Sequence, residues 1–392
     1  MPVLLYLLAV AVFAQGTSEF VLAGILPGIA THLDVSLGHA GLLTSALAVG
    51  MVIGAPAMAA AARRVSPRRT LTCFLALFVA AHVVGAVTDS FTVLLATRIA
   101  AALANAGFLA DALATVTRIV PAERQTRALA VILGGTTLAL VAGVPAGAVI
   151  GDFLGWRATL WAIALLCLPA LAAVLIATPT RPTGADGTEV AGSIGGELAS
   201  LRSRPVQIAL GLAVLVNAAT FCTFTYLAVI ATGPALPERA VPVLLAVFGL
   251  GAFLGVRTAG RFGDRHWRRL ITVTAPLLMA GWALLALSVA IPAALWVLGL
   301  TQGALSFALG STLIARVLAN RTRCPDDGRV VRDRRAEHRR RHRPLAGGIA
   351  IDTIGGRGPA LVSAALVLLT VVLCSAVSTR FRSPVARLGH PS

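Results

Sequence analysis

Two ionisable side chains lie inside long apolar stretches of the sequence, where they could bind and release a proton. Glu19 lies within VFAQGTSEFVLAG, and Arg98 lies within LLATRIAAALA. A charge in hydrocarbon costs several kcal/mol unless it faces a polar cavity or an opposite charge. Burial favours the protonated carboxyl group and a nearby guanidinium favours the carboxylate, so such a pair can exchange protons. We predict that Glu19 and Arg98 lie at one depth and form the proton-coupling pair; a static buried ion pair is the alternative.

Amide and aromatic side chains in two apolar stretches could line a cavity for a small amphiphilic molecule. Ligand cavities are mostly apolar and contain a few polar groups that orient the ligand. Asn105 follows Arg98 by seven residues and shares its helix face, and the other candidates lie in VNAATFCTFTY. The predicted cavity residues are Asn105, Asn217, Phe221, Phe224 and Tyr226. Packing within a helix bundle is the alternative for each, and we interpret His82 as a core histidine with satisfied hydrogen bonds.

The sequence indicates no other site chemistry. It contains no phosphate-binding glycine loop, no catalytic triad and no cluster with metal-ligand spacing. Its five cysteines are an odd number without metal or redox spacing. We therefore expect no cofactor, neither metal, nucleotide nor prosthetic group, and no enzymatic activity.

The elements that must position these residues are membrane helices. Of the 392 residues, 57% are hydrophobic and only 12% are charged, and the mean hydropathy is +0.86. This is far more apolar surface than the core of a soluble protein can bury. Apolar stretches of about 20 residues can cross the bilayer. Such stretches lie near residues 3–26, 38–60, 70–88, 91–114, 127–149 and 157–178, and near residues 207–231, 239–260, 270–289, 292–318 and 360–379.

The basic residues indicate the orientation of these spans. All 33 basic residues are Arg, and many cluster between alternate spans, at 63–69, 118–127 and 261–269. Because cytoplasmic loops carry the excess of positive charge, we predict a multi-pass plasma-membrane protein with both termini in the cytoplasm. A net charge of +17 would indicate polyanion binding in a soluble protein, but here it sets topology. No nucleic-acid partner is expected.

The series of spans predicts an all-α membrane protein with two helix bundles. Residues 1–178 form the N-terminal six-helix bundle, and residues 179–206 form a cytoplasmic linker. Residues 207–380 form the C-terminal bundle, and residues 381–392 form a cytoplasmic tail. Two similar bundles around a site at the membrane midplane are typical of secondary transporters. A polytopic membrane protein of another kind is the alternative.

A pattern of glycine and charged residues follows the span predicted at 239–260. The stretch GVRTAGRFGDRHWRR contains Gly255, Gly260, Arg261, Asp264, Arg265, Arg268 and Arg269. Small residues let two helices approach closely. Asp264 can pair with an arginine or a helix N-terminus and hold the cytoplasmic side closed. The matching stretch of the first half keeps Gly54, Arg68 and Arg69 but has no acid.

A second glycine pattern lies at the end of the span predicted at 127–149. In GVPAGAVIG, Gly143, Gly147 and Gly151 are four residues apart, which places them on one helix face. Pro145 lies between them. This composition predicts a helix that packs closely and can bend, although plain helix packing would produce the same pattern.

These motifs resemble those of the major facilitator superfamily. The stretch 255–269 is similar to its cytoplasmic loop signature, and TRIAAALANAGF is similar to its intramembrane arginine motif. GVPAGAVIG resembles the signature of its antiporters, with Val144-Pro145 in place of the usual Gly-Pro pair. AVFAQGTSEF, LVNAATFCTFTYLA and QGALSFALGSTLIARVL extend the resemblance to the drug:proton antiporter branch with twelve spans, and within it to actinobacterial chloramphenicol resistance exporters.

The resemblance implies the major facilitator fold, with two six-helix bundles, and proton-coupled efflux of chloramphenicol or a similar small drug. It implies a monomer in membrane lipid that the proton gradient drives. An exporter of a sugar or another metabolite from the same branch is the near alternative, and a membrane receptor without transport is a remote one.

Residues 320–344 interrupt the resemblance. The stretch 321–344 contains ten Arg and four acids where the family places its eleventh span. A GC-rich back-translation of residues 324–344, shifted by one base, encodes a small, apolar and glycine-rich peptide that would complete a twelfth span. We hypothesise a local frameshift. An expanded cytoplasmic loop that faces anionic headgroups is the alternative, and a nucleic-acid arm is disfavoured because the stretch has no stacking aromatic residue.

Overall fold

The computed structural model describes residues 3–62, 66–177, 204–232, 236–321 and 355–381, and these contain helices and no strand. The first half contains α1 (Val3–Phe20), α2 (Leu22–His32), α3 (Leu37–Ala40), α4 (Leu42–Ala62), α5 (Pro67–Val87), α6 (Phe91–Ile119), α7 (Ala122–Leu138), the π-helical turn η1 (Ala139–Gly143), α8 (Val144–Leu154) and α9 (Trp156–Ala177). The second half contains α11 (Arg204–Thr225), α12 (Leu227–Ala231), η2 (Glu238–Ala240), α13 (Val241–Leu287), α14 (Pro292–Arg321), η3 (Gly355–Arg357) and α16 (Gly358–Phe381).

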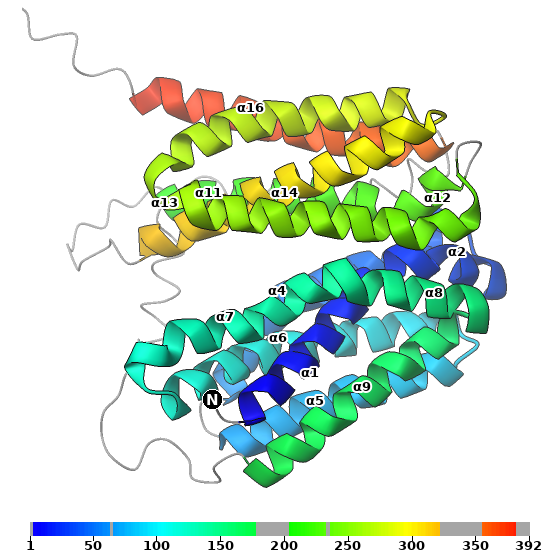
Figure 1. Ribbon diagram of the computed structural model, residues 1–392, viewed down its shortest axis with the longest axis vertical. Helices are drawn as coiled ribbons and strands as arrows, with labels where there is room; N and C mark the ends of the chain where they lie inside the picture. The colour runs from blue at the N-terminus through cyan, green and yellow to red at the C-terminus, as the bar shows by residue number, and fades with distance from the viewer. Residues whose placement is uncertain (1–2, 63–65, 178–203, 233–235, 322–354, 382–392) are drawn as a thin grey trace, which may run out of the picture.

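The helices of the two halves form two groups that lie side by side (Figure 1). Contact between the halves involves α2 with α11 and α12, and η1 and α8 with α13. Buried residues from both halves belong to one hydrophobic cluster, which includes Phe20, Leu140 and Ala148 from the first half and Phe224 and Leu245 from the second. The two halves therefore share an apolar interface.

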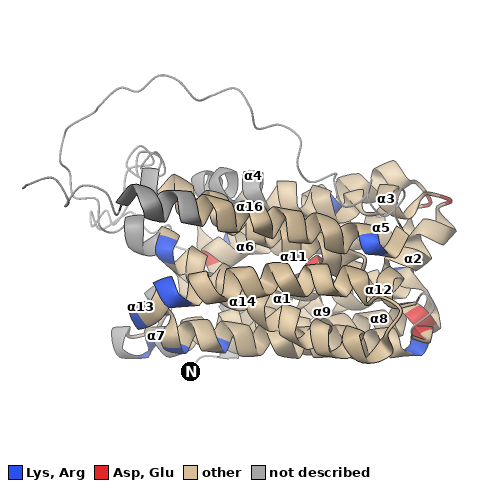
Figure 2. Cartoon of the chain, turned by 90° about the horizontal axis from the view of Figure 1, so that it is seen from above, with Lys and Arg blue, Asp and Glu red and all other residues tan. Residues whose placement is uncertain are grey.

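Charge is distributed as a membrane protein requires. Figure 2 shows that the described charged residues gather towards the two ends of the helices, with few between them. Within the described ranges, nine helices are long and apolar enough to cross a membrane, or ten if α1 and the α2 that follows it count as one bent span. The predicted all-α membrane architecture is confirmed. The linker 179–203, the segment 322–344 and the tail 382–392 lie outside the described residues.

The first helix of each half is broken rather than continuous, which the sequence did not predict. The axes of Leu4–Phe20 and Leu22–His32 differ by 53°, and the second of these segments extends the span beyond residue 26. In the second half, Tyr226 has non-helical angles (φ −104°, ψ 10°) and separates α11 from α12. Broken helices at corresponding positions of two halves commonly flank a transporter's binding site.

The span predicted at 127–149 contains a π-helical turn. Ala139–Gly143 form η1 between α7 and α8. Pro145 follows two residues later; it has no N–H to donate to the carbonyl of Val141, and its ring crowds that carbonyl. A wider turn just before the proline relieves this conflict, and π turns are frequent at functional sites.

The predicted loop between the spans at 239–260 and 270–289 is mostly helical. These residues belong to α13, in which only His266 has non-helical angles (φ −124°, ψ 26°). The candidate spans are Glu238–Gly263 and Arg265–Leu287, which meet at this kink. The connection expected at 261–269 is therefore short, and the residues on both sides of the break at His266 are helical, which suits arginine as a good helix former.

Candidate functional site

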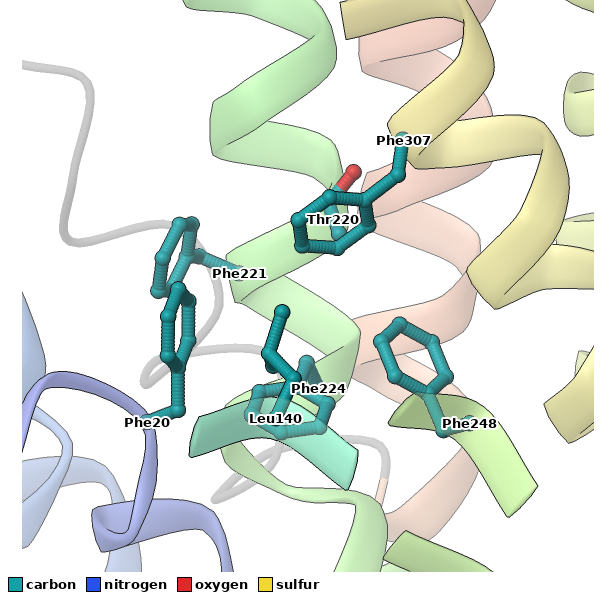
Figure 3. A pocket seen from close by; sticks show the side chains of 7 residues that line it. All are labelled: Phe20, Leu140, Thr220, Phe221, Phe224, Phe248 and Phe307. Carbon is teal, nitrogen blue, oxygen red and sulfur yellow. The ribbon is translucent and has the colours of Figure 1, made fainter. Parts of the chain in front are cut away.

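A small apolar pocket, about 10 Å³ in volume, lies between the two halves (Figure 3). Its lining residues are Phe20 at the end of α1, Leu140 in η1, Thr220, Phe221 and Phe224 on α11, Phe248 on α13, and Phe307 on α14. Drug-sized ligands usually occupy pockets of about 300–1,000 Å³. The pocket is therefore contracted in this conformation.

The phenylalanines form a connected set of aromatic contacts across the interface. Phe20 of the first half stacks on Phe221 of the second, with ring centroids 5.4 Å apart and an interplanar angle of 15°. Phe20 also meets Phe224 edge-on at 6.2 Å, and Phe224 lies 4.8 Å from Phe248. Offset-stacked and edge-on pairs are the favoured aromatic geometries. This wall depends on both halves, and it lies beside both helix breaks.

Two of the predicted cavity residues, Phe221 and Phe224, line this pocket, and three do not. Asn217 is exposed, although it lies only one turn from Phe221. Asn105 is buried on α6 within the first half, away from the lining. Tyr226 is buried, and its hydroxyl group lies so close to Gly41 that a side chain there would collide with it. A role for these three in a cavity stays a prediction.

Five lining residues were not predicted from the sequence: Phe20, Leu140, Thr220, Phe248 and Phe307. Thr220 and Phe20 are direct neighbours of predicted site residues. Single phenylalanines such as Phe248 and Phe307 look the same in an apolar stretch whether they face lipid, core or ligand. Only packing distinguishes these cases.

Arg98 and Glu19 are not paired in this structure. Arg98 is fully buried, and its Nη1 donates to Ser18 Oγ at 3.3 Å. The ion pairs found among the described residues do not include one between Arg98 and Glu19. The expected contact is therefore displaced by one residue, because Ser18 and Glu19 point about 100° apart on the same helix. The predicted role of the two charges in proton coupling is not tested by this geometry.

His82 is a buried histidine with hydrogen bonds on both ring nitrogens, as predicted. Its Nε2 lies 2.6 Å from Ser18 Oγ, and its Nδ1 lies 2.8 Å from the carbonyl oxygen of Phe78. Arg98, Ser18 and His82 thus form one connected network across α6, α1 and α5. The only sequence signal for this network is the hydroxyl residue directly before Glu19, and its meaning is clear only from the structure.

The glycines of GVPAGAVIG pack against the first helix. A Cβ atom at Gly143, Gly147 or Gly151 would collide with Thr17, Val21 or Ile25, in that order, on α1 and α2 and at the break between them. Pro145 is half-buried in the first turn of α8. These glycines therefore permit the close helix contact, while their part in conformational change stays a prediction.

A further close approach joins the first half to the second at η1. A Cβ atom at Gly249 of α13 would collide with the backbone of Leu140, and one at Gly24 would meet Ala148 and Leu245. The segment η1–α8 is thus clamped between α1–α2 on one side and α13 on the other.

Some residues of the two cytoplasmic motifs pack closely against neighbouring helices, and others do not. A Cβ atom at Gly255 would meet the backbone of Ala304 on α14, and one at Gly54 would meet Leu103 and Ala106 on α6. A Cβ atom at Gly260 would have no neighbour within 4 Å. The exposed side chains are Arg69, Arg261, Arg265, Arg268 and Arg269, and Arg68 is half-buried. The side chain of Asp264 is not among those described, so its pairing stays a prediction.

An exposed polar cluster joins three connections at the opposite end. Arg157 donates to Asp89 Oδ1 at 2.5 Å and to the carbonyl oxygen of Thr88 at 2.9 Å. Its Nη1 also lies 2.7 Å from His32 Nε2, and its guanidinium lies over the Trp156 ring at 4.5 Å. Exposed ion pairs contribute little stability. The cluster nevertheless holds the end of α2 beside the start of α9.

Comparison with known proteins identifies the fold and the family. The model of the Major Facilitator Superfamily matches residues 8–324. A chloramphenicol resistance protein from Streptomyces lividans is 54% identical over 324 residues, which cover 81% of each chain.

Solved transporters share the fold at low identity. An inward-facing, unoccupied bacterial homologue of the human lysosomal transporter Spinster is similar with a TM-score of 0.63 and 19% identity, covering 96% of this chain and 94% of that one. The nucleoside transporter NupG is similar with a TM-score of 0.67 and 12% identity, covering 97% and 98%. The family match spans most of the sequence, so this chain belongs to the major facilitator superfamily.

Proposed function

We propose that this protein exports chloramphenicol, or a similar small amphiphilic drug, in exchange for protons and thereby confers antibiotic resistance. The observation that carries the proposal is the aromatic pocket shared by the two halves. An aromatic ring of a drug can stack between Phe20 and Phe221 once the pocket widens, and the Thr220 hydroxyl can orient a polar group. The 54% identity to a chloramphenicol resistance protein supports the same substrate.

The proton gradient supplies the energy in this proposal, and no cofactor is required. Glu19 directly precedes Phe20, a residue of the pocket wall, so a change of charge at Glu19 acts beside the drug. Glu19 binds a proton from the outside and releases it to the cytoplasm, and Arg98 favours the ionised state when it approaches. Protonation and drug binding alternate, which couples the two fluxes in opposite directions.

The proposed location is the plasma membrane, with both termini in the cytoplasm. With this orientation, the end where α2 meets α12 faces the outside, and the arginines of α13 face the cytoplasm. Contact between α2, η1 and α8 of the first half and α11, α12 and α13 of the second then closes the outer side. We expect a monomer whose partners are the drug and membrane lipid, without nucleic-acid binding or enzymatic activity.

A sugar exporter is disfavoured by the pocket lining. Thr220 has the only polar side chain among its lining residues. A sugar would lose most of its hydrogen bonds with water in such a pocket, at a cost of several kcal/mol. A receptor is a further alternative, which transport assays distinguish.

The decisive experiment measures labelled chloramphenicol in cells with and without the protein. Export lowers the steady-state accumulation and raises drug tolerance, and a protonophore abolishes both effects. In inverted membrane vesicles, export becomes uptake that the protonophore collapses. Equal accumulation in the two strains would contradict the proposal.

A further inference from the structure

A chain of hydrogen bonds around Arg98 joins three helices inside the first half. Arg98 Nη1 donates to Ser18 Oγ, Ser18 Oγ lies 2.6 Å from His82 Nε2, and His82 Nδ1 lies 2.8 Å from the Phe78 carbonyl. Arg98, Ser18 and His82 are each at most 1% exposed. The chain is therefore sealed from solvent, and each proton in it must be held by a group within it.

Arg98 at one end and the Phe78 carbonyl at the other fix which group donates in each hydrogen bond of this chain. A guanidinium can only donate, so Ser18 Oγ is the acceptor for Arg98. A carbonyl oxygen can only accept, so His82 carries a proton on Nδ1. The Ser18 hydroxyl then donates to His82 Nε2, which is an acceptor only in the neutral ring. A charged imidazolium would instead place a second buried cation beside Arg98 and leave the Ser18 proton without this acceptor.

In the described part of the protein, only Nη1 of the Arg98 guanidinium has a hydrogen-bond acceptor. Among the described residues, no acceptor lies within hydrogen-bonding distance of Arg98 Nε or Nη2. A buried donor without a partner is destabilising, and more so when it is charged. Glu19, the residue after Ser18, is partly buried and is not paired with Arg98. Arg98 therefore has donors available for a second acceptor, and the nearest acid in sequence to its present acceptor is Glu19.

We propose that His82 is a positioning residue for proton coupling. By accepting the Ser18 hydroxyl proton, His82 keeps Ser18 Oγ oriented as an acceptor for Arg98. This holds the guanidinium away from Glu19 while Glu19 is protonated. When Glu19 releases its proton, the carboxylate competes with Ser18 for the guanidinium, and His82 sets how readily Arg98 transfers. The inference rests on the proposed function, because it assigns His82 to the proton exchange of that transporter.

Few other titratable groups near this chain can change the pH dependence of proton exchange at Glu19. The helices packed around the chain are α4, α7, α8 and α9, and α4 carries no titratable side chain. Within the membrane, α9 contributes only the buried thiol of Cys167. On α6 itself, Asp111 lies thirteen residues from Arg98 and accepts a hydrogen bond from Thr70. The remaining titratable groups on these helices are Tyr6 on α1, Cys73 on α5 and, towards helix ends, Arg68 and Arg69 on α5, Arg118 on α6, Glu123, Arg124 and Arg127 on α7, Asp152 on α8 and Arg157 on α9.

The test compares His82→Asn with His82→Gln. Binding of labelled chloramphenicol to purified protein is measured across a pH series. In an antiporter, protons displace the drug, so binding is lost as pH falls through a midpoint. His82→Asn keeps a donor near the Nδ1 position but lacks the acceptor at the Nε2 position. Arg98 then approaches Glu19 more easily and stabilises the carboxylate. We expect the midpoint to move to lower pH by about 0.5–1 unit, a threefold to tenfold weaker proton affinity.

Four further variants separate positioning from packing. His82→Gln restores an acceptor near the Nε2 position, so it should rescue much of the midpoint shift. Ser18→Ala breaks the same chain and should shift the midpoint in the same direction, and the double variant Ser18→Ala/His82→Asn should shift it no further. Thr97→Val is the matched control, because Thr97 is buried beside Arg98 and its hydroxyl donates to the Leu94 carbonyl of its own helix.

Two results would overturn the proposal. A purely structural histidine would lower the amount of folded protein or the maximal binding without moving the midpoint. Nitrogen NMR of histidine-labelled protein gives the second readout, since the proposal requires His82 as the neutral Nδ1–H tautomer; an Nε2–H or charged ring would refute it. If the unaltered protein bound no chloramphenicol, the proposed function would fail, and the NMR result would still decide the state of His82.

Discussion

At the scale of single residues, aromatic rings from both halves pack against one another at the interface of the described residues. Phe20 and Phe221 stack across the interface, and Glu19 and Arg98 remain apart. In the proposed function, drug recognition and proton exchange therefore use different side chains, which are adjacent along α1. Substitutions can separate the two.

Glu19→Gln should abolish proton-coupled efflux and leave the protein in the membrane. The amide is nearly isosteric with the protonated carboxyl group, but it cannot release a proton. Chloramphenicol accumulation should rise to the level of cells without the protein, while the amount of protein in membranes stays the same. Full drug extrusion by this variant would reject the proton role of Glu19.

Phe221→Ala should weaken drug binding without affecting proton exchange. Removal of one stacked ring costs about 1–2 kcal/mol, so the drug concentration at half-maximal transport should rise roughly tenfold. Phe253→Ala is the control, because Phe253 lies on α13 and is exposed on the surface of the bundle. Equal effects of the two substitutions would show that the pocket does not contact the drug.

Prediction at this scale succeeded where a residue type is unusual in its surroundings. A histidine and an arginine in hydrocarbon must have partners or a cavity, so their burial and their involvement in polar contacts follow from cost alone. The identity of the partner does not follow. Ser18 and Glu19 are neighbours, and the rotation of α1 about its own axis decides which of them faces Arg98.

At the scale of elements, the hydropathy pattern locates helices but not their breaks. The broken first helices have no proline or glycine at Val21 or Tyr226. At the second of these breaks, the hydroxyl group of Tyr226 reaches the glycine at residue 41 in the other half. The break at His266 lies between helical residues on both sides. Periodicity in one segment carries no information on such contacts.

Gly249→Ala should disturb the contact of α13 with η1. The added methyl group would collide with the backbone of Leu140, which cannot move as a side chain tip can. We expect a cost of about 1–3 kcal/mol, a Tm lower by several degrees in detergent and slower drug export.

Gly211→Ala is the matched control for that substitution. Gly211 lies within α11, and a methyl group there meets no atom within 4 Å. Its Tm should stay the same or rise slightly, because alanine is the better helix former by about 1 kcal/mol. Equal destabilisation by both substitutions would show that the close approach of α13 to η1 is unimportant.

At the scale of the whole molecule, the predicted major facilitator fold is confirmed. Hydropathy alone predicted the membrane helices, because the bilayer imposes the length of a span. The family motifs added the fold, and the orientation drawn from the arginines stays a prediction. The boundaries of the two bundles stay predictions, since residues 179–203 lie outside the described part. The family match ends at residue 324, at the start of the Arg-rich segment.

Resequencing of the gene should reveal a shift of one base in the region that encodes residues 320–344. The corrected frame should encode an apolar span, since the family fold has twelve. Expression of the corrected gene should then increase the amount of protein in the membrane and the drug tolerance of the cells. A verified frame with the arginines intact would instead make this segment a cytoplasmic loop.

The composition of the pocket wall bears on how new resistance arises. Only Phe20 and Leu140 come from the first half, and the other lining residues all come from the second. Genetic exchange of the second half between related exporters would therefore replace most of the drug-contacting surface in one event. The proposed proton-coupling residues on α1, α5 and α6 would be inherited unchanged. If they act as proposed, selection can broaden the spectrum of exported antibiotics while the energy coupling stays the same.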